Sequence, residues 1–103
     1  MIMERCTQKV ISTNKEAYEL EIEFDALESK LEGVPQKRRY WAGYCSLPAN
    51  TMVWERDWPS LAAVEAYNQT IAKDPEWRKL FEKANKVYTD LVFEIFRGIT
   101  LRE

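Results

Sequence analysis

The feature that most constrains the fold is the order in which two kinds of hydrophobic spacing alternate along the chain. Apolar residues at intervals of three and four are typical of an amphipathic helix, whereas short runs of β-branched and aromatic residues are typical of strands. Strand-like runs cover residues 2–11, 39–48, 51–58 and 87–99, and helical spacing follows the first and the third of them. The predicted order is therefore β-α-β-β-α-β, in a single domain that covers residues 1–103.

The first helical segment has clear start and stop signals. Thr13 is followed three residues later by Glu16, the pattern of a capping box. Gly33 and Pro35 predict its end, as a glycine cap with a proline just beyond. Its predicted buried stripe consists of Leu20, Phe24, Leu27 and Leu31.

The second helical segment begins after Ser60, a favourable N-cap residue, and is interrupted near Asp74. Asp74 is able to cap a new start, with Pro75 at the first helical position, where its missing N–H costs nothing. Asp74 and Glu76 therefore have a capping role, and catalysis by them is not expected. The apolar positions before and after the interruption are Leu61, Val64, Tyr67, Ile71, Trp77, Leu80, Phe81 and Ala84.

This order is that of a ferredoxin-like α+β fold, with an antiparallel four-stranded sheet and helices on one face. The expected strand order is 4-1-3-2, which places the first and second strands on either side of the third. Their backbones would lie about 9–10 Å apart, too far for Cys6 to reach Cys45 within one subunit. We expect no internal disulfide.

Two predicted strands are apolar on both faces, although the helices can cover only one. In strand 39–48, Tyr40 and Tyr44 lie on one face and Trp41, Cys45 and Leu47 on the other. In the last strand, Leu91, Phe93 and Ile95 oppose Val92 and Phe96. A bare apolar face needs a partner, so we expect a homodimer in which two sheets close into a dimeric α+β barrel.

Charge and composition exclude several partners. The formal net charge is −2 and the pI about 5.3, which gives no general attraction to nucleic acid or to an anionic membrane. The densest basic run, Lys37–Arg39, is expected to be solvated. No apolar run approaches the roughly 20 residues that span a bilayer, and the N-terminus does not look like a secretory signal. We therefore expect a cytoplasmic protein with reduced cysteines.

The chain contains no histidine. This excludes Ser-His-Asp and Cys-His nucleophilic pairs, most zinc sites and a histidine ligand for haem. No clustered Asp/Glu loop suggests a magnesium or calcium site. The sequence therefore predicts no metal and no cofactor.

Trp54, Arg56 and Trp58 stand at alternate positions of one strand and so share a face. In one interpretation the two indoles sandwich an organic group, and Arg56 binds its carboxylate or enolate. In the other, Arg56 pairs with Glu4 or Glu94 on a neighbouring strand, and the indoles fill the dimer core. The sequence leaves both open.

Trp41 and Tyr44 are further candidate ligand-binding residues, because with Tyr40 they could line a cavity mouth or, equally, the dimer seam. Tyr67 and Trp77 lie on helix stripes and are expected to belong to the core.

The segment from 52 to 77, "MVWERDWPSLAAVEAYNQTIAKDPEW", resembles the NIPSNAP family of the dimeric α+β barrel superfamily. The matching features are a strand that carries Trp54, a Pro/Ser helix start, an alanine-rich helix and the "DPEW" corner at 74–77. The opening "MERCTQKVI" before a glutamate-rich helix is also similar, although its turn reads "STNKE" where the family has a glycine. The resemblance implies a homodimer with a cavity between each sheet and its helices or within the barrel, but no settled reaction.

Three functional hypotheses follow. The first is a NIPSNAP-like protein that binds a small apolar or aromatic acid in its cavity. The second, drawn from relatives in the superfamily, is a cofactor-independent monooxygenase or isomerase with Glu4 or Glu94 as base. The third is a non-catalytic dimerisation module. A cavity favours the first two, and a solidly packed interior favours the third.

Overall fold

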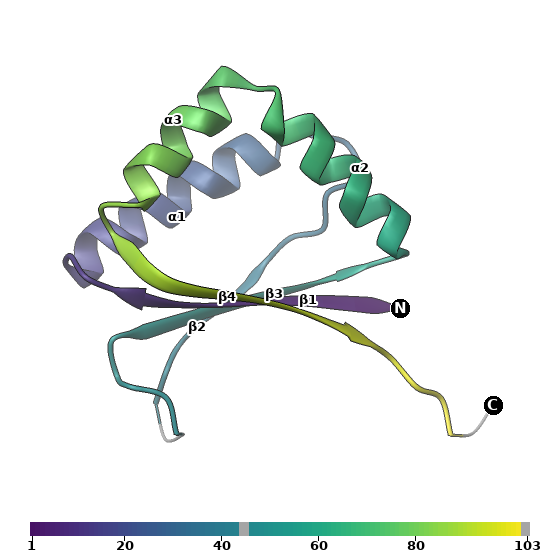
Figure 1. Cartoon of the computed structure of the whole chain (residues 1–103), viewed down its shortest axis with the longest axis horizontal. Helices are drawn as coiled ribbons and strands as arrows, with labels where there is room; N and C mark the ends of the chain where they lie inside the picture. The colour runs from purple at the N-terminus through teal and green to yellow at the C-terminus, as the bar shows by residue number, and fades with distance from the viewer. Residues whose placement is uncertain (44–45, 102–103) are drawn as a thin grey trace.

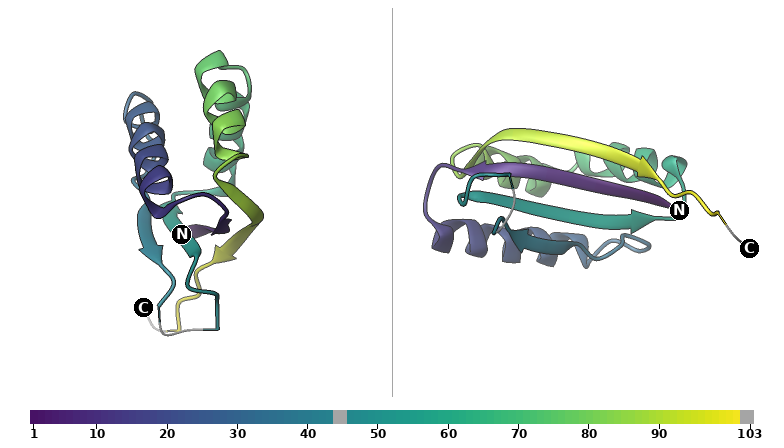
Figure 2. Two further views of the ribbon diagram at one scale, coloured as in Figure 1. Left: turned by 90° about the vertical axis from the view of Figure 1, so that its left-hand side faces the viewer. Right: turned by 90° about the horizontal axis from the view of Figure 1, so that it is seen from below.

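The computed structural model describes residues 1–43 and 46–101. The described elements are β1 (Ile2–Val10), α1 (Asn14–Glu28), β2 (Arg38–Trp41), β3 (Thr51–Trp58), α2 (Leu61–Ala72), α3 (Pro75–Ala84) and β4 (Tyr88–Arg97). The four strands form one antiparallel sheet in the order β2-β3-β1-β4, and all three helices lie on one face of it (Figures 1 and 2). The ferredoxin-like fold and the predicted strand order are confirmed.

The helices begin at the capping residues that the sequence predicts. The side chains of Thr13, Ser60 and Asp74 each accept a hydrogen bond from a backbone N–H two or three residues ahead, at 2.9–3.2 Å. Pro75 cannot continue α2, because it lacks an N–H, but it suits the first turn of α3. The second helical segment is thus two helices, which meet at an angle above the sheet (Figure 1).

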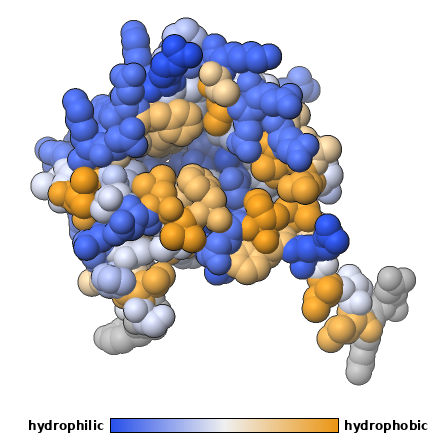
Figure 3. All heavy atoms as spheres, viewed as in Figure 1, coloured by the Kyte–Doolittle hydropathy of each residue, from blue (hydrophilic) through white to orange (hydrophobic). Residues whose placement is uncertain are grey.

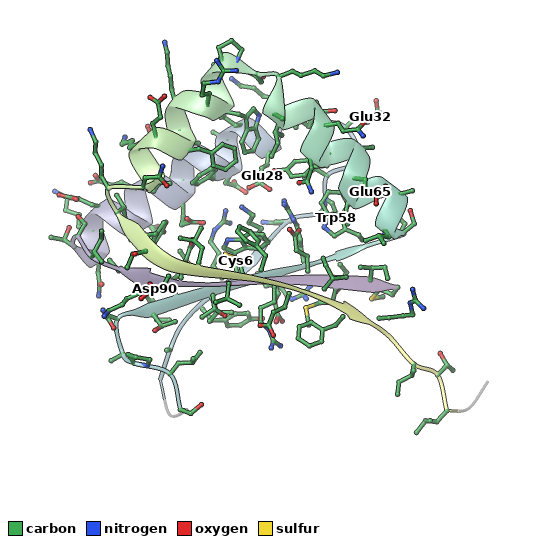
Figure 4. The ribbon with its side chains drawn as sticks, viewed as in Figure 1. Cys6, Glu28, Glu32, Trp58, Glu65 and Asp90 are labelled. Carbon is green, nitrogen blue, oxygen red and sulfur yellow. The ribbon has the colours of Figure 1, made fainter. Side chains whose placement is uncertain are left out.

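The alternation of buried and exposed residues in β1 and β3 positions the core. Cys6 pairs with Trp54, and Glu4 with Arg56, so their side chains share the face that the helices cover. Tyr67 and Trp77 are buried from the helix side, as predicted. Figure 4 shows Cys6 and Trp58 on this side of the sheet and Glu28 between α1 and the sheet.

The second strand is shorter than predicted. Pairing with β3 reaches Ala42, whose N–H donates to the Thr51 carbonyl at 2.9 Å, but the strand itself ends at Trp41. Gly43, a poor strand former, follows directly, and a tight turn closed by a 3.0 Å bond from Thr51 N–H to the Pro48 carbonyl leads into β3. The predicted strand 39–48 was wrong at this end. Tyr44 and Cys45 lie outside the described residues.

The last strand is distorted near its start. Its register with β1 shifts between Thr7 and Lys9, and close by Asp90 has a φ of 53°. This left-handed conformation is rare for residues with a side chain but is tolerated best by Asn and Asp. From Phe93 onward the side chains alternate regularly, with Phe93 toward the helices and Phe96 toward the opposite face.

The opposite face of the sheet is uncovered (Figure 2). It exposes apolar side chains from both edge strands, including Tyr40, Val92 and Phe96, which are 38–51% exposed. Charged residues lie among them: Arg38 bonds Asp57 at 3.0 Å, and the Arg5 guanidinium carbon lies 4.9 Å from the centre of the Phe96 ring. We call this surface the open face.

Candidate functional site

A cavity of about 140 Å³ lies between the helix-covered side of the sheet and the helices. On the side where β4 lies in front, the space-filling view shows a hollow between the helices and this strand (Figure 3). Much of its wall is aromatic, with rings from α1, β3, α2, α3 and β4: Phe24, Trp54, Tyr67, Trp77, Phe81 and Phe93. The lining also includes four charged side chains, which determine what the cavity can bind: Glu4, Glu21, Lys37 and Arg56.

Arg56 is held inside the protein rather than presented to solvent, and its side chain is 2% exposed. Its Nε donates to Glu4 Oε1 at 2.9 Å, and Nη1 donates to Glu28 Oε2. Trp58 Nε1 donates to the same Glu4 oxygen at 2.9 Å. The predicted pairing with Glu4 is confirmed, whereas Glu94 stands opposite Arg5 and so faces away from the cavity.

Three aromatic rings surround this guanidinium. Its central carbon lies 5.0 Å from the ring centres of Trp54 and Trp58 and 4.7 Å from that of Tyr67. Cation–π attraction of this kind strengthens when water is excluded. The group between the two indoles is therefore Arg56 itself, and the indoles face the helices rather than the open face.

Glu28, at the last turn of α1, is the point where the charges meet. Its side chain is 7% exposed, and one of its oxygens is taken by Arg56. The other, Oε1, lies 2.9 Å from Lys37 Nζ and 3.9 Å from Arg39 Nη2. The Lys37 contact is a close ion pair, and its hydrogen bond to Glu28 is among the causes that raise the Lys37 pKa, whereas Arg39 Nη2 is buried without a hydrogen-bond partner. The site thus contains one unused buried donor beside a carboxylate that three cations share.

Lys37 is buried, so the expectation that the basic run 37–39 is solvated was wrong for this residue. Its side chain is 6% exposed, and its amine lies 4.1 Å from the ring centre of Trp54 and 5.2 Å from that of Phe24. Burial lowers the pKa of Lys37 below its usual 10.5 and Arg56 lowers it further, while Glu28 and Glu21 act in the opposite direction. The net effect favours the neutral amine more than in a solvated lysine.

A second chain of contacts joins α1 to the sheet. Arg39 Nε donates to Glu21 Oε1 at 2.7 Å, and the Tyr88 hydroxyl donates to Glu21 Oε2 at 2.8 Å. Burial, with the adjacent Glu21 carboxylate, raises the pKa of Tyr88 above its usual range. Burial likewise raises the pKa of the Cys6 thiol to about 12, so this thiol is not a nucleophile at neutral pH.

The charges of this region balance when Lys37 is protonated. Lys37, Arg39 and Arg56 stand against three buried carboxylates, Glu4, Glu21 and Glu28. Both arginines keep their protons at any ordinary pH, so Lys37 is the cation whose charge can change.

The structure separates the residues singled out from the sequence. Trp54 and Arg56 line the cavity, and Trp58 packs on Tyr67 with ring centres 5.3 Å apart. Trp41 lies at the edge of the sheet, 44% exposed, where it lines a separate surface groove of about 350 Å³ with α1. Tyr44 is outside the described residues.

Sequence reasoning missed Glu21, Glu28, Lys37 and Arg39. A signal was present in α1, because Glu21 and Glu28 are seven residues apart and flank Phe24 on the buried side of the helix. Glutamates on a buried stripe need cations, and the nearest basic run along the chain is 37–39.

Neither a metal site nor a membrane span is found in the part of the chain that the structure describes. Among residues 1–43 and 46–101, no three His, Cys, Asp or Glu side chains are grouped so that they could hold an ion. No helix within these ranges is long and apolar enough to cross a membrane.

Comparison with known proteins shows similarity in structure but not in sequence. No protein-family model matches the sequence, and no curated protein matches it either. Protein Atu4242 from Agrobacterium tumefaciens superposes with a TM-score of 0.78 at 14% identity, over 98% of this chain and 96% of that one. A second crystal structure describes Atu4242 as a NIPSNAP family protein with unknown function.

Two further solved structures extend this similarity. An uncharacterized NIPSNAP domain protein from Burkholderia xenovorans has a TM-score of 0.73 at 16% identity, with 100% of this chain and 99% of that chain covered. SnoaB, a cofactor-independent oxygenase from Streptomyces nogalater, has a TM-score of 0.73 at 14% identity, with 99% and 97% covered. The fold that the NIPSNAP resemblance implied is confirmed: this chain shares it with NIPSNAP proteins and with a cofactor-independent oxygenase.

Proposed function

We propose that the protein binds a small aromatic or apolar acid in the cavity between its sheet and its helices. The observation that carries this proposal is an aromatic-walled cavity whose lining includes the buried amine of Lys37. A chain that served only for dimerisation would have no need of a hollow interior with charged groups in it.

The size of the cavity limits the ligand. Ordinary pockets for drug-sized ligands measure about 300–1,000 Å³. The cavity here, at about 140 Å³, is close to the roughly 150 Å³ of an engineered apolar cavity that binds benzene. The expected ligand therefore has a single ring or an aliphatic group of similar volume.

Among the residues that line the cavity, Arg56 is not free to bind the acidic group of the ligand. Arg56 already has Glu4 and Glu28 as partners, and Arg39 has Glu21. Lys37 has one carboxylate within 4.0 Å among the described residues, Glu28, and it shares this carboxylate with Arg56 and Arg39. A ligand acid would thus bind near Lys37, with its ring against Trp54 and Phe24.

The proposal is tested by filling the cavity. Ala84, on α3, is partly buried and lines it, so Ala84→Phe would place a ring in the space proposed for the ligand. Ala66→Phe makes the same change on the exposed side of α2 and is the matched control. We expect benzoate to quench tryptophan fluorescence in the parent protein and in A66F, but not in A84F. Equal binding by all three would place the ligand elsewhere, and binding by none would contradict the proposal.

We further propose that the protein is a cytoplasmic homodimer whose two open faces pack together. The exposed apolar side chains of this face support the proposal, as do the dimeric barrels of the superfamily that the sequence resembles. Phe96→Glu should give a monomer in light scattering after gel filtration. Ile22→Glu, an equally drastic change at an exposed position of α1, should leave a dimer. Dimers in both variants would exclude this interface.

Cofactor-independent oxygenation is the second candidate. SnoaB shares the fold, and the cavity of this chain combines aromatic walls with an amine that could serve as base. Such an enzyme consumes O2 when an electron-rich phenol is added, without metal or flavin. Oxygen uptake that A84F abolishes and A66F retains would favour this activity over simple binding. Tight binding of the phenol with no uptake would exclude it for that phenol.

A further inference from the structure

We propose that Lys37 is the proton acceptor of the cavity: it takes the proton of an acidic hydroxyl on a bound single-ring aromatic and holds the resulting oxyanion beside its ammonium group. This inference rests on the proposed binding function and deepens it, since it names the charged state in which the ligand is bound. The O–H bond of the ligand breaks, an N–H bond forms on Lys37, and no electron is lost or gained.

The position of the amine supports this role. Lys37 precedes β2, and its side chain reaches under α1 to the cavity, where its amine lies 4.1 Å from the Trp54 ring centre and 5.2 Å from that of Phe24. A ring that packs on these two walls would carry its hydroxyl within reach of the amine. The amine has up to three N–H donors, and Glu28 supplies the one carboxylate within 4.0 Å of it among the described residues.

The groups around Lys37 explain why it, and not a neighbour, would exchange the proton. Glu28 and Glu21 face it from α1, Arg56 from β3, and Arg39 from β2 approaches the same Glu28 oxygen at 3.9 Å. Glu28 is shared by three cations, so the attraction that would keep Lys37 protonated is divided. The burial that lowers the pKa of Lys37 acts in the same direction.

A bound oxyanion would reverse this balance. It would give the ammonium a negative partner of its own beside a side chain that is 6% exposed, and charge-assisted hydrogen bonds are strong in such buried positions. The amine and the ammonium of Lys37 would thus be two states of one site, and ligand binding would shift Lys37 toward the ammonium.

The test uses 4-nitrophenol, whose anion has a visible absorption band that the neutral phenol lacks, at a pH well below the pKa of the free phenol. The matched ligand is 4-nitroanisole, which has nearly the same shape and no acidic proton. We expect the parent protein to bind 4-nitrophenol with the spectrum of the anion. Lys37→Met should bind it about tenfold more weakly and without the anion band, while its affinity for 4-nitroanisole is unchanged.

Lys37→Arg distinguishes a residue that accepts the ligand's proton from one that only supplies a positive charge. This variant also keeps the test valid if the methionine variant does not fold. The guanidinium can pair with the anion but cannot take up its proton, because it is already protonated. Calorimetry in two buffers with different ionisation enthalpies should show about one proton released to buffer per ligand bound for K37R, and about none for the parent protein.

The outcomes separate this inference from the proposed function. A neutral spectrum for the bound phenol, or equal proton release by the parent protein and K37R, would overturn the role of Lys37 and leave binding intact. An anion band that persists in K37M would assign the proton to another group. Failure of the parent protein to bind either aromatic would count against the proposed function itself.

Discussion

The charge network makes a strong prediction about Arg56. Arg56→Met removes the cation that Glu4 and Glu28 share and leaves both carboxylates buried, with Trp58 Nε1 and Lys37 as their remaining partners. Removal of one partner from a buried ion pair typically costs about 3–5 kcal/mol. The methionine stem replaces part of the packing against the three rings, so most of the loss would be electrostatic.

This cost is a large share of the roughly 5–15 kcal/mol by which a domain is stable. It is measured by urea unfolding at one protein concentration, since a dimer would make the midpoint depend on concentration. Lys83→Met is the control: it breaks a 2.7 Å ion pair with Glu23 between α3 and α1 whose two side chains are 56% and 47% exposed. Such exposed pairs contribute about 0–1 kcal/mol.

The pH dependence of the stability lost in R56M provides a second check. A buried carboxylate without its cation is relieved by binding a proton, so the stability gap between R56M and the parent protein should narrow as the pH falls from 7 to 5. A loss in R56M no larger than in K83M would refute the reasoning, as would a gap that widens on acidification. The first result would mean that Arg56 adds little to the stability of the fold, and the second that the carboxylates left without Arg56 are not relieved by binding protons.

Three other residues carry simpler predictions. Burial raises the pKa of Tyr67 to about 12 from the usual 10.0. As the pH rises above 10, the unfolded state therefore loses this phenol proton before the folded state does. The contribution of the Tyr67 proton to the free energy of unfolding is thus present below pH 10 and lost toward pH 12. Tyr67→Phe should therefore lose less stability than the parent protein between pH 10 and 11 in alkaline urea titrations, by up to about 1.4 kcal/mol per pH unit. Peptide mapping after iodoacetamide treatment at pH 8.5 should find Cys6 unmodified in the folded protein and modified in urea, since its thiol is fully buried; labelling of Cys6 without urea would contradict this. At Asp90, with φ of 53°, a valine should cost about 1–2 kcal/mol in unfolding free energy and a glycine almost nothing, and equal losses would argue against the left-handed backbone.

The elements of the fold were predictable because their signals are local. Thr13, Ser60 and Asp74 mark helix starts in the sequence, and each makes the predicted capping bond. The end of β2 was not predictable to the same degree, because the strand propensity of Tyr40 and Trp41 does not show where pairing with β3 stops, and β2 ends at Trp41. The strand propensity of a residue does not fix where a strand ends, because the end depends on which backbone groups pair with the neighbouring strand.

The site was predictable only in part, because it depends on contacts between distant segments. Alternation placed Trp54, Arg56 and Trp58 on one face, but it does not say whether helices or a second subunit cover that face. Likewise, a basic run next to a strand is usually solvated, and only the approach of α1 with Glu28 makes a buried position acceptable for Lys37. The residues that distinguish this interior from an ordinary core come from three separate parts of the chain.

The buried charges are difficult to explain by stability alone. Apolar residues of similar volume in place of a buried ion pair are often neutral or stabilising, so the pairs of Arg56 with Glu4 and Glu28 are weak evidence of a structural need. Their arrangement suits another purpose: with Arg39 and Glu21 they sum to one negative charge, and Lys37, beside an aromatic-walled cavity, is the group that balances this charge and can gain or lose a proton. A site of this kind admits an uncharged aromatic molecule and can bind it as an anion, because Lys37 takes up the proton that the molecule loses. That combination is the physical argument for the proposal that the protein binds its ligand in the cavity rather than on the open face.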